Sequence, residues 1–122
     1  MVTTAIILLS HGSRLPEAQA TLNAYRAMIA GSGLYDMVEA ASLQFNKPDL
    51  EEAVAAVVAK GAGRVIVAPI FLYRGVHIQH DIPEIVAAMN ERYPGLEFLL
   101  AGSIGADQRL AEIIIDRIKE VI

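Results

Sequence analysis

Short apolar runs alternate with helical patterns four times along this chain. Nearly continuous apolar runs predict strands at residues 4–10, 37–45, 64–71 and 96–101. Runs of this kind are typical of parallel strands, because other elements cover both faces of such strands. The order of the runs therefore favours a sheet whose strands are joined by helices.

Apolar residues at helical spacing predict helices at 16–30, 48–60, from about 81 to 92, and at 107–121. The third helix is expected to begin near Asp81, because Asp81-Ile82-Pro83-Glu84 has the spacing of a capping box. The last helix has an apolar side that we expect to face inward, formed by Leu110, Ile113, Ile114, Ile118 and Val121.

The strict alternation of strands and helices predicts an α/β fold. We expect a four-stranded parallel sheet flanked by helices, a three-layer sandwich of the flavodoxin-like or chelatase-like kind, with residues 1–122 as a single domain. A flavodoxin-like strand order places the first strand beside the third. The ends of these two strands would then open into the same crevice, where ligands of open parallel sheets bind.

Composition narrows the class of protein. The chain is 54% hydrophobic with a net charge of -4, which argues against disorder and against a nucleic-acid partner. It has no cysteine, so any metal must be held by nitrogen and oxygen ligands. The first apolar run is too short for a membrane span and has no basic region before it. We therefore expect a cytoplasmic protein with no membrane partner.

Two histidines follow the two strands that should lie side by side. His11 comes directly after the first strand, and His77 lies a few residues past the third. Two imidazoles at one sheet edge could bind a metal ion or transfer protons. Alternatively, His11 belongs to a plain strand-to-helix turn and only forms hydrogen bonds with the backbone. A serine nucleophile lacks its usual G-x-S-x-G setting, and the glycine patterns of phosphate-binding loops are also missing.

A second, more local metal pair could arise from the spacing of His77 and His80. Residues three apart can share one side of a helix. We favour instead a solvated His80 beside a single site histidine, with Asp81 acting as a helix cap rather than a ligand.

Several segments together resemble a known family. Ser10-His11-Gly12-Ser13-Arg14, residues 43–50, residues 69–72, Gly75-Val76-His77 and Asp81-Ile82-Pro83 are similar, in order and spacing, to the sirohydrochlorin cobaltochelatase family in its short, single-domain form. The resemblance covers nearly the whole chain. It implies a lyase-class chelatase that inserts a divalent metal into the tetrapyrrole sirohydrochlorin during anaerobic cobalamin biosynthesis. Co²⁺ is the typical metal, and Ni²⁺ or Fe²⁺ stay open.

The same resemblance assigns roles to individual residues. It implies that His11 and His77 are catalytic and bind the metal, which is a substrate, with no organic cofactor. Many relatives have glutamate where this chain has Gln44, whose amide oxygen can ligate a metal but cannot accept a proton. Short members resemble one half of longer two-repeat chelatases, which implies a homodimer.

Contacts to the ring are expected from residues near the strand ends. The substrate is flat, apolar on its faces and rich in carboxylates. An apolar floor would come from Leu72, Tyr73, Val76 and Ile78. The polar and small residues expected to meet the ring or its carboxylates are Ser13, Arg14, Lys47, Arg74, Gly12 and Gly75.

Two non-catalytic readings stay open. A tetrapyrrole or metal carrier is favoured by Gln44, since an uncharged amide cannot serve as a base. A flavodoxin-like binding module with incidental histidines would use neither imidazole. An assay of metal insertion separates both of these functions from that of an enzyme.

Overall fold

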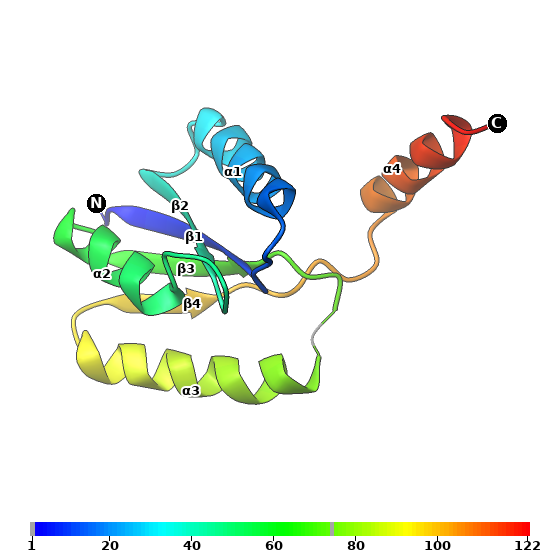
Figure 1. Ribbon diagram of the computed structural model, residues 1–122. Coiled ribbons are helices and arrows are strands. Elements are labelled where there is room, and N and C mark those ends of the chain that lie inside the picture. Colours follow the sequence, from blue (N-terminus) through cyan, green and yellow to red (C-terminus); the bar gives the residue numbers. More distant parts are fainter. Residues whose placement is uncertain (1, 74) are drawn as a thin grey trace.

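Four parallel strands form the centre of the molecule in a computed structural model that describes residues 2–73 and 75–122, without the side chains of 76–79 (Figure 1). The strands are β1 (Thr4–Ser10), β2 (Met37–Ser42), β3 (Arg64–Pro69) and β4 (Glu97–Leu100). Their order is β2-β1-β3-β4, and every neighbouring pair is parallel. The predicted pairing of the first strand with the third is confirmed.

Helices lie on both faces of this sheet. α1 (Pro16–Gly31) covers one face, and α2 (Leu50–Ala59) and α3 (Val76–Arg92) cover the other (Figure 1). The predicted three-layer α/β fold is therefore confirmed. The last helix, α4 (Gln108–Lys119), stands away from the sheet at the end of an extended connector.

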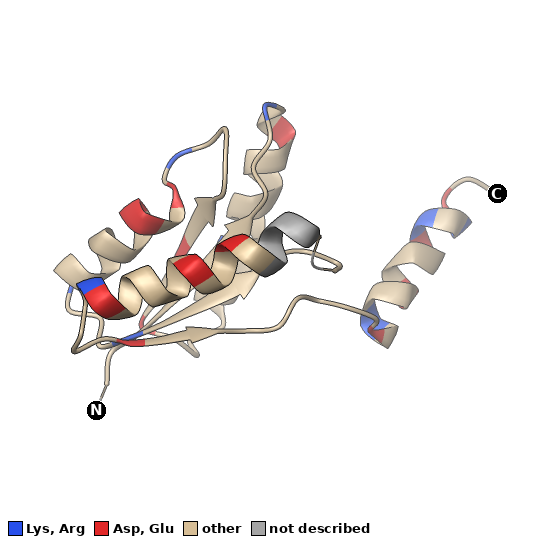
Figure 2. Ribbon diagram, turned by 90° about the horizontal axis from the view of Figure 1, so that it is seen from below, with Lys and Arg blue, Asp and Glu red and all other residues tan. Residues whose placement is uncertain are grey.

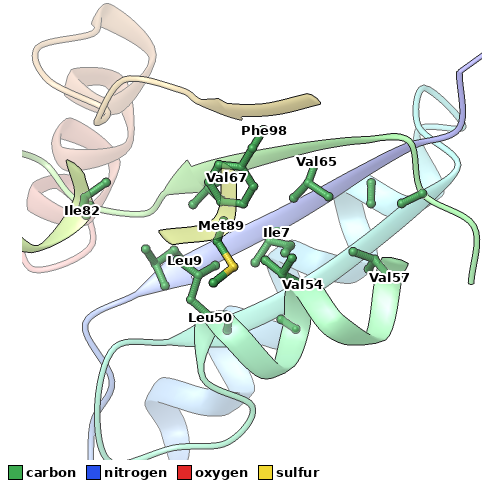
Figure 3. Close-up of a cluster of buried hydrophobic side chains, with 14 of the residues drawn as sticks. Ile7, Leu9, Leu50, Val54, Val57, Val65, Val67, Ile82, Met89 and Phe98 are labelled. Atoms are coloured by element: carbon green, nitrogen blue, oxygen red, sulfur yellow. The ribbon is translucent and has the colours of Figure 1, made fainter. Parts of the chain in front are cut away.

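The main hydrophobic core lies between the sheet and the α2/α3 layer. Side chains alternate between the two faces of a strand, so Ile7 and Leu9 of β1 and Val65 and Val67 of β3 point to the same side (Figure 3). The helices meet them with apolar side chains, namely Leu50, Val54, Val57, Ile82 and Met89. This packing fixes the central strands from which the loops at the carboxyl edge extend.

The start of α2 is set by its cap. The Asp49 carboxylate accepts a bond from the Glu52 backbone N–H at 2.8 Å, and the Glu52 carboxylate accepts one from the Asp49 N–H at 3.1 Å. This reciprocal pair satisfies two donors that a helix leaves free at its N-terminus. The helix therefore begins at Leu50, two residues after the predicted start at position 48.

The third helix begins earlier than predicted. It starts at Val76, after Gly75 in extended conformation, and Pro83 lies inside it. The expected capping box at Asp81 is wrong, because proline removes only its own N–H bond and the turn before it still forms. His77 consequently belongs to the first turn of α3 rather than to a loop.

The expectation that the last helix faces inward is also wrong for this chain. Every residue of α4 is described, and none of them is buried. Its apolar side, with Ile113, Ile114 and Ile118, is exposed. Periodicity identified the helix but did not identify what it packs against.

No helix in the part of the chain that the structure describes combines the length and the apolar character that crossing a bilayer requires.

Truncating a central core side chain tests this packing. Ile7 of β1 is fully buried in the core between the sheet and the α2/α3 layer, so Ile7→Ala should lower the free energy of unfolding by about 2–5 kcal/mol, measured by urea denaturation. Asn90→Ala on the exposed side of α3 is the control and should stay within about 0.5 kcal/mol of the parent chain. Similar losses in both variants would contradict this account of the core.

Candidate functional site

The ends of β1 and β3 bring the two sequence-predicted histidines to one edge of the sheet. Leu9 is in register with Pro69, and the Ile70 N–H donates to the Leu9 carbonyl at 2.8 Å. His11 lies one residue past the end of β1, and His77 lies in the first turn of the helix that follows β3. The side chain of His77 is outside the described part, so the separation of the two rings stays a prediction.

The imidazole of His11 is exposed and rests on an aromatic ring from the neighbouring loop. Its ring centre lies 4.1 Å from that of Phe71, with the two planes tilted by 37°. Phe71 itself is buried. A rigid aromatic support under one face of the imidazole keeps it at the sheet edge with access to solvent.

The loop after β1 lies directly against the loop after β2. The Leu43 N–H donates to the Ser10 carbonyl at 3.0 Å, and the Gln44 N–H donates to the His11 carbonyl at 3.2 Å. Gly12 has a φ of +93°, and a Cβ added there would lie 1.7 Å from the Gln44 carbonyl oxygen. Glycine is therefore required for this backbone contact, which makes Gln44 the immediate neighbour of His11.

The expectation that Gly75 lets the backbone approach the ring stays a prediction, and no contact with a described protein atom requires glycine there. Gly75 has an ordinary φ of -76°, and an added Cβ would meet no described atom within 4 Å. Its place as the N-cap of α3 is compatible with glycine but does not demand it.

Ser13 and Asn46 tie the same two loops together. The Ser13 N–H donates to Asn46 Oδ1 at 2.8 Å, and the Ser13 hydroxyl accepts a bond from the Leu15 N–H at 3.1 Å. A hydroxyl that accepts one bond still has a proton to donate. Ser13 can therefore bind an anionic group without giving up its structural contact.

Arg14 stands over Phe45 at the same edge. Its guanidinium carbon lies 4.7 Å from the centre of the Phe45 ring, a cation–π contact worth about 0.5–1 kcal/mol at an exposed site. Phe45 has a φ of +67° and an exposed ring. The contact holds Arg14 next to the loop of Gln44 while its N–H groups keep access to solvent.

Lys47, which is expected to meet substrate carboxylates, lies in ion pairs at the start of α2 in this structure, and its contact with substrate stays a prediction. Its ammonium lies 3.0 Å from the Glu52 carboxylate and 3.7 Å from that of Asp49. The Glu52 contact, supported by Asp49, raises the pKa of Lys47. The hydrogen bond that the Asp49 N–H donates to the Glu52 carboxylate lowers the pKa of Glu52, and the hydrogen bond from Lys47 adds a smaller effect in the same direction. Arg74 lies outside the described residues.

The expected apolar floor is present in part. Leu72 and Tyr73 are both exposed, and they line a hollow of about 470 Å³ with Leu110 and Ile114 of α4. The connector is bonded to this loop, because the Gly105 N–H donates to the Leu72 carbonyl at 2.7 Å. The side chains of Val76 and Ile78 lie outside the described part.

Among the described side chains, no further metal ligands gather at this edge. His80 and Asp81 are exposed within α3, and no group of three His, Asp or Glu side chains able to hold a metal occurs among the described residues. Figure 2 shows Asp and Glu along α2 and α3, with Lys and Arg scattered over several elements. Attraction for an anionic ligand must therefore be local, as at Arg14.

Sequence reasoning missed three residues of this edge. Phe45 is predicted as the end of the second strand, whereas β2 ends at Ser42, and Asn46 carries no periodic signal. Only the loop geometry brings these two residues to Arg14 and Ser13. Phe71 was assigned to a strand, whereas β3 ends at Pro69 and frees Phe71 to support His11.

Comparison with known proteins gives consistent results. The family model CbiX matches residues 5–121. The sirohydrochlorin cobaltochelatase of Saccharolobus solfataricus is 33% identical over 94% of this chain and 93% of its own length. The sirohydrochlorin chelatase SirB of Bacillus subtilis subspecies spizizenii, solved in complex with cobalt, superposes with a TM-score of 0.90 at 29% identity over 98% of this chain and 51% of SirB. SirB of Bacillus subtilis with Fe³⁺ gives a TM-score of 0.87 at 28% identity over 98% of this chain and 47% of SirB.

A pair of glycine substitutions tests the contact between the two loops. Gly12→Ala and Gly61→Ala both place alanine at a φ near +95°, which costs about 1–2 kcal/mol of unfolding free energy in each case. Only Gly12→Ala also drives a Cβ into the Gln44 carbonyl, whereas position 61 is open. Urea denaturation should therefore show a clearly larger loss for Gly12→Ala, and equal losses would count against the contact.

Proposed function

This chain belongs to the CbiX family, and we propose that it is a sirohydrochlorin cobaltochelatase, a lyase that inserts Co²⁺ into a tetrapyrrole in anaerobic cobalamin biosynthesis. The observation that carries the proposal is the exposed imidazole of His11 just after β1, beside the strand whose following helix has His77 in its first turn. The relatives' activity supports the choice of substrate.

The chemistry requires a weak metal site next to proton acceptors. Insertion removes water ligands from the ion and two protons from pyrrole nitrogens, and it forms four metal–nitrogen bonds in the ring. Neutral imidazole binds divalent Co, Ni, Fe and Zn and also accepts protons. In this proposal His11 and His77 hold the ion before transfer and take up the released protons.

Two histidine ligands suit a site that passes its metal ion on better than a site that keeps the ion bound. Structural zinc sites normally use four protein ligands, which would hold the ion too firmly to pass it on. Gln44 adds at most a neutral carbonyl oxygen, placed beside His11 by the backbone bond between them. Loose ligation by this set favours release of the ion into the ring.

The ring's position follows from the groups around His11. Leu72 and Tyr73 offer exposed apolar surface for its face, and Arg14 and Ser13 offer donors for its carboxylates. Arg74 and Gly75 are proposed on the family resemblance alone.

Cobalt is the metal that we propose, with nickel and iron as alternatives for the same ring. Most nitrogen and oxygen sites bind these ions in the same general order of affinity. Affinity therefore does not show which ion this particular site uses. SirB has been solved with cobalt and with Fe³⁺, so a related chelatase accommodates more than one metal.

A non-catalytic metal or tetrapyrrole carrier is the second candidate, favoured by Gln44 in place of a carboxylate. Mixing the chain with sirohydrochlorin and Co²⁺, Ni²⁺ or Fe²⁺ and following the visible spectrum separates the two functions. A chelatase accelerates formation of the metallated spectrum at catalytic concentration. A carrier binds the ring or ion without turnover.

Removing either site histidine should impair insertion. His11→Ala and His77→Ala should each lower kcat/KM for cobalt insertion by about 10²–10⁴-fold, since each removes a ligand and a proton acceptor. His80→Ala, in the exposed part of the same helix, should keep the parent rate. Circular dichroism melts confirm that the variants are folded, and full activity in a folded His77→Ala chain would remove His77 from the mechanism.

Adding a charge beside His11 should strengthen metal binding. Gln44→Glu should increase the affinity for Co²⁺ at neutral pH in a calorimetric titration, because a carboxylate attracts the ion where an amide does not. Gln108→Glu on α4 is the control for added charge away from this edge. Equal affinities in the two variants would show that side chain 44 does not meet the ion.

A further inference from the structure

Phe45 differs from the other phenylalanines of this chain because its ring lies open to solvent. Of the three phenylalanines, Phe71 and Phe98 are buried, whereas Phe45 is 57% exposed. A single exposed apolar side chain is common on protein surfaces and carries no meaning by itself. Two further features set Phe45 apart, namely the backbone that holds it and the place where it lies.

The backbone at Phe45 has a conformation that glycine adopts most readily. Its φ is +67°, and the Asn46 N–H donates to the Gln44 carbonyl at 2.8 Å, across Phe45. A bond from residue i+2 to residue i around a positive φ makes a γ-turn of the rare, strained kind. All other positive φ values among the described residues belong to glycine, at positions 12, 33, 61 and 105. The chain therefore has a bulky aromatic residue at a position where glycine would be less strained.

This strained turn is fastened to the loop of His11 on both sides. Before Phe45, the Gln44 N–H donates to the His11 carbonyl at 3.2 Å. After it, Asn46 Oδ1 accepts from the Ser13 N–H at 2.8 Å. The surrounding contacts therefore impose the conformation of the turn. Strained residues that their neighbours hold in this way are concentrated at active sites and ligand clamps.

One face of the Phe45 ring meets a cation. The Arg14 guanidinium carbon lies 4.7 Å from the ring centre, and the exposure of the ring leaves apolar surface open beside it. Arg64, Arg109 and Arg117 each contact a carboxylate. No carboxylate of the described residues pairs in this way with Arg14, which is exposed. A guanidinium that rests on an aromatic ring keeps its planar set of N–H donors for an incoming carboxylate.

The strand order places Phe45 and the apolar floor on opposite sides of His11. The sheet has the order β2-β1-β3-β4, so the loop of His11 after β1 lies between the loop of Phe45 and the loop of Leu72 and Tyr73. Neighbouring strands lie about 4.8 Å apart, which puts the ends of β2 and β3 about 10 Å apart. A flat ring centred at His11 can therefore contact exposed apolar side chains on both flanks.

We propose that Phe45 binds the tetrapyrrole: the open part of its ring packs on the macrocycle, and Arg14, held over its other face, binds a carboxylate at the rim of the same macrocycle. This role rests on the proposed function, since it names a further contact of the same site. Aromatic stacking and a charge-assisted hydrogen bond then act through one pair of side chains. Such a pair selects a ring that is apolar on its faces and anionic at its rim, and it takes no part in binding the metal.

The first experiment measures ring binding without metal. Sirohydrochlorin is titrated into the metal-free chain, and the change in its visible absorbance gives Kd. Phe45→Leu should raise Kd about 3–10-fold, the equivalent of one lost aromatic stacking contact. The affinity for Co²⁺ alone, measured by calorimetry, should stay the same. Tyr25→Leu, which removes an exposed aromatic ring from α1, is the control and should keep the parent Kd.

Steady-state kinetics of cobalt insertion should show the same division. Phe45→Leu should raise KM for sirohydrochlorin with kcat unchanged, because the lost contact holds the ring equally before and during the reaction. A fall in kcat at unchanged KM would place Phe45 in the chemical step instead, and it would overturn a role in ring binding.

The second experiment tests whether Phe45 and Arg14 act as a unit. Arg14→Gln should also weaken ring binding, and it should reduce the dependence of Kd on salt, since it removes a charge. Because Phe45 orients Arg14, the Phe45→Leu, Arg14→Gln double variant should lose less affinity than the product of the two single losses. Single losses that simply multiply would overturn the orienting role of Phe45.

The third experiment separates ring binding from folding. Phe45→Gly and Phe45→Ala both remove the aromatic ring, so both should bind sirohydrochlorin at least as weakly as Phe45→Leu. Only glycine relieves the strained turn, so Phe45→Gly should unfold at a higher urea concentration than Phe45→Ala. Ring affinity that follows the urea midpoint across these variants would show that Phe45 serves stability, and it would overturn the proposal.

These outcomes also separate the role of Phe45 from the proposed function. A parent chain that neither binds sirohydrochlorin nor accelerates insertion would refute both. A parent chain that inserts metal, together with Phe45 variants that bind the ring as tightly as Tyr25→Leu, would refute the role of Phe45 alone. Circular dichroism establishes that each variant is folded. If Phe45→Leu does not fold, Phe45→Gly decides the question, because its turn is the less strained one.

Discussion

The pairing of β1 with β3 is the contact on which the rest of this molecule depends. It places β1, the most buried strand, beside β3 at the centre of the sheet, and it starts the two following loops from adjacent points. The bond from Ile70 to Leu9 closes the ladder at the carboxyl edge. Everything assigned to the site, from the support of His11 by Phe71 to the place of α3, follows from that adjacency.

The site is held together by backbone contacts more than by side chains. Loop 10–13 and loop 42–46 share main-chain bonds, and Gly12 lets them approach more closely than any other residue would allow. Side chains that touch the edge, such as Arg14 and Ser13, are therefore attached to a stiff frame. A stiff frame with few ligands is suited to an ion that must be held briefly in one position.

The sequence predicted the fold class, the strand order and the sheet edge that carries His11. These depend on hydrophobic periodicity and on topology, which are local and general rules. The start of α3 was mispredicted because proline marks a permitted helix start, not a required one. Phe45 and Asn46 could not be predicted, since their roles come from a left-handed turn and a contact between distant loops. The amphipathic side of α4 was recognised, but periodicity cannot tell which surface such a side will meet.

In the proposed role of His11 as a metal ligand, its exposure has a consequence for the speed of metal loading. An imidazole that lies open to solvent on a buried ring can be reached by a hydrated ion without any opening motion of the described fold. In the proposed function, the ion then has to lose water from its own coordination shell before it enters the ring. Selection among ions at such a site rests on geometry, ligand type and metal availability rather than on equilibrium affinity.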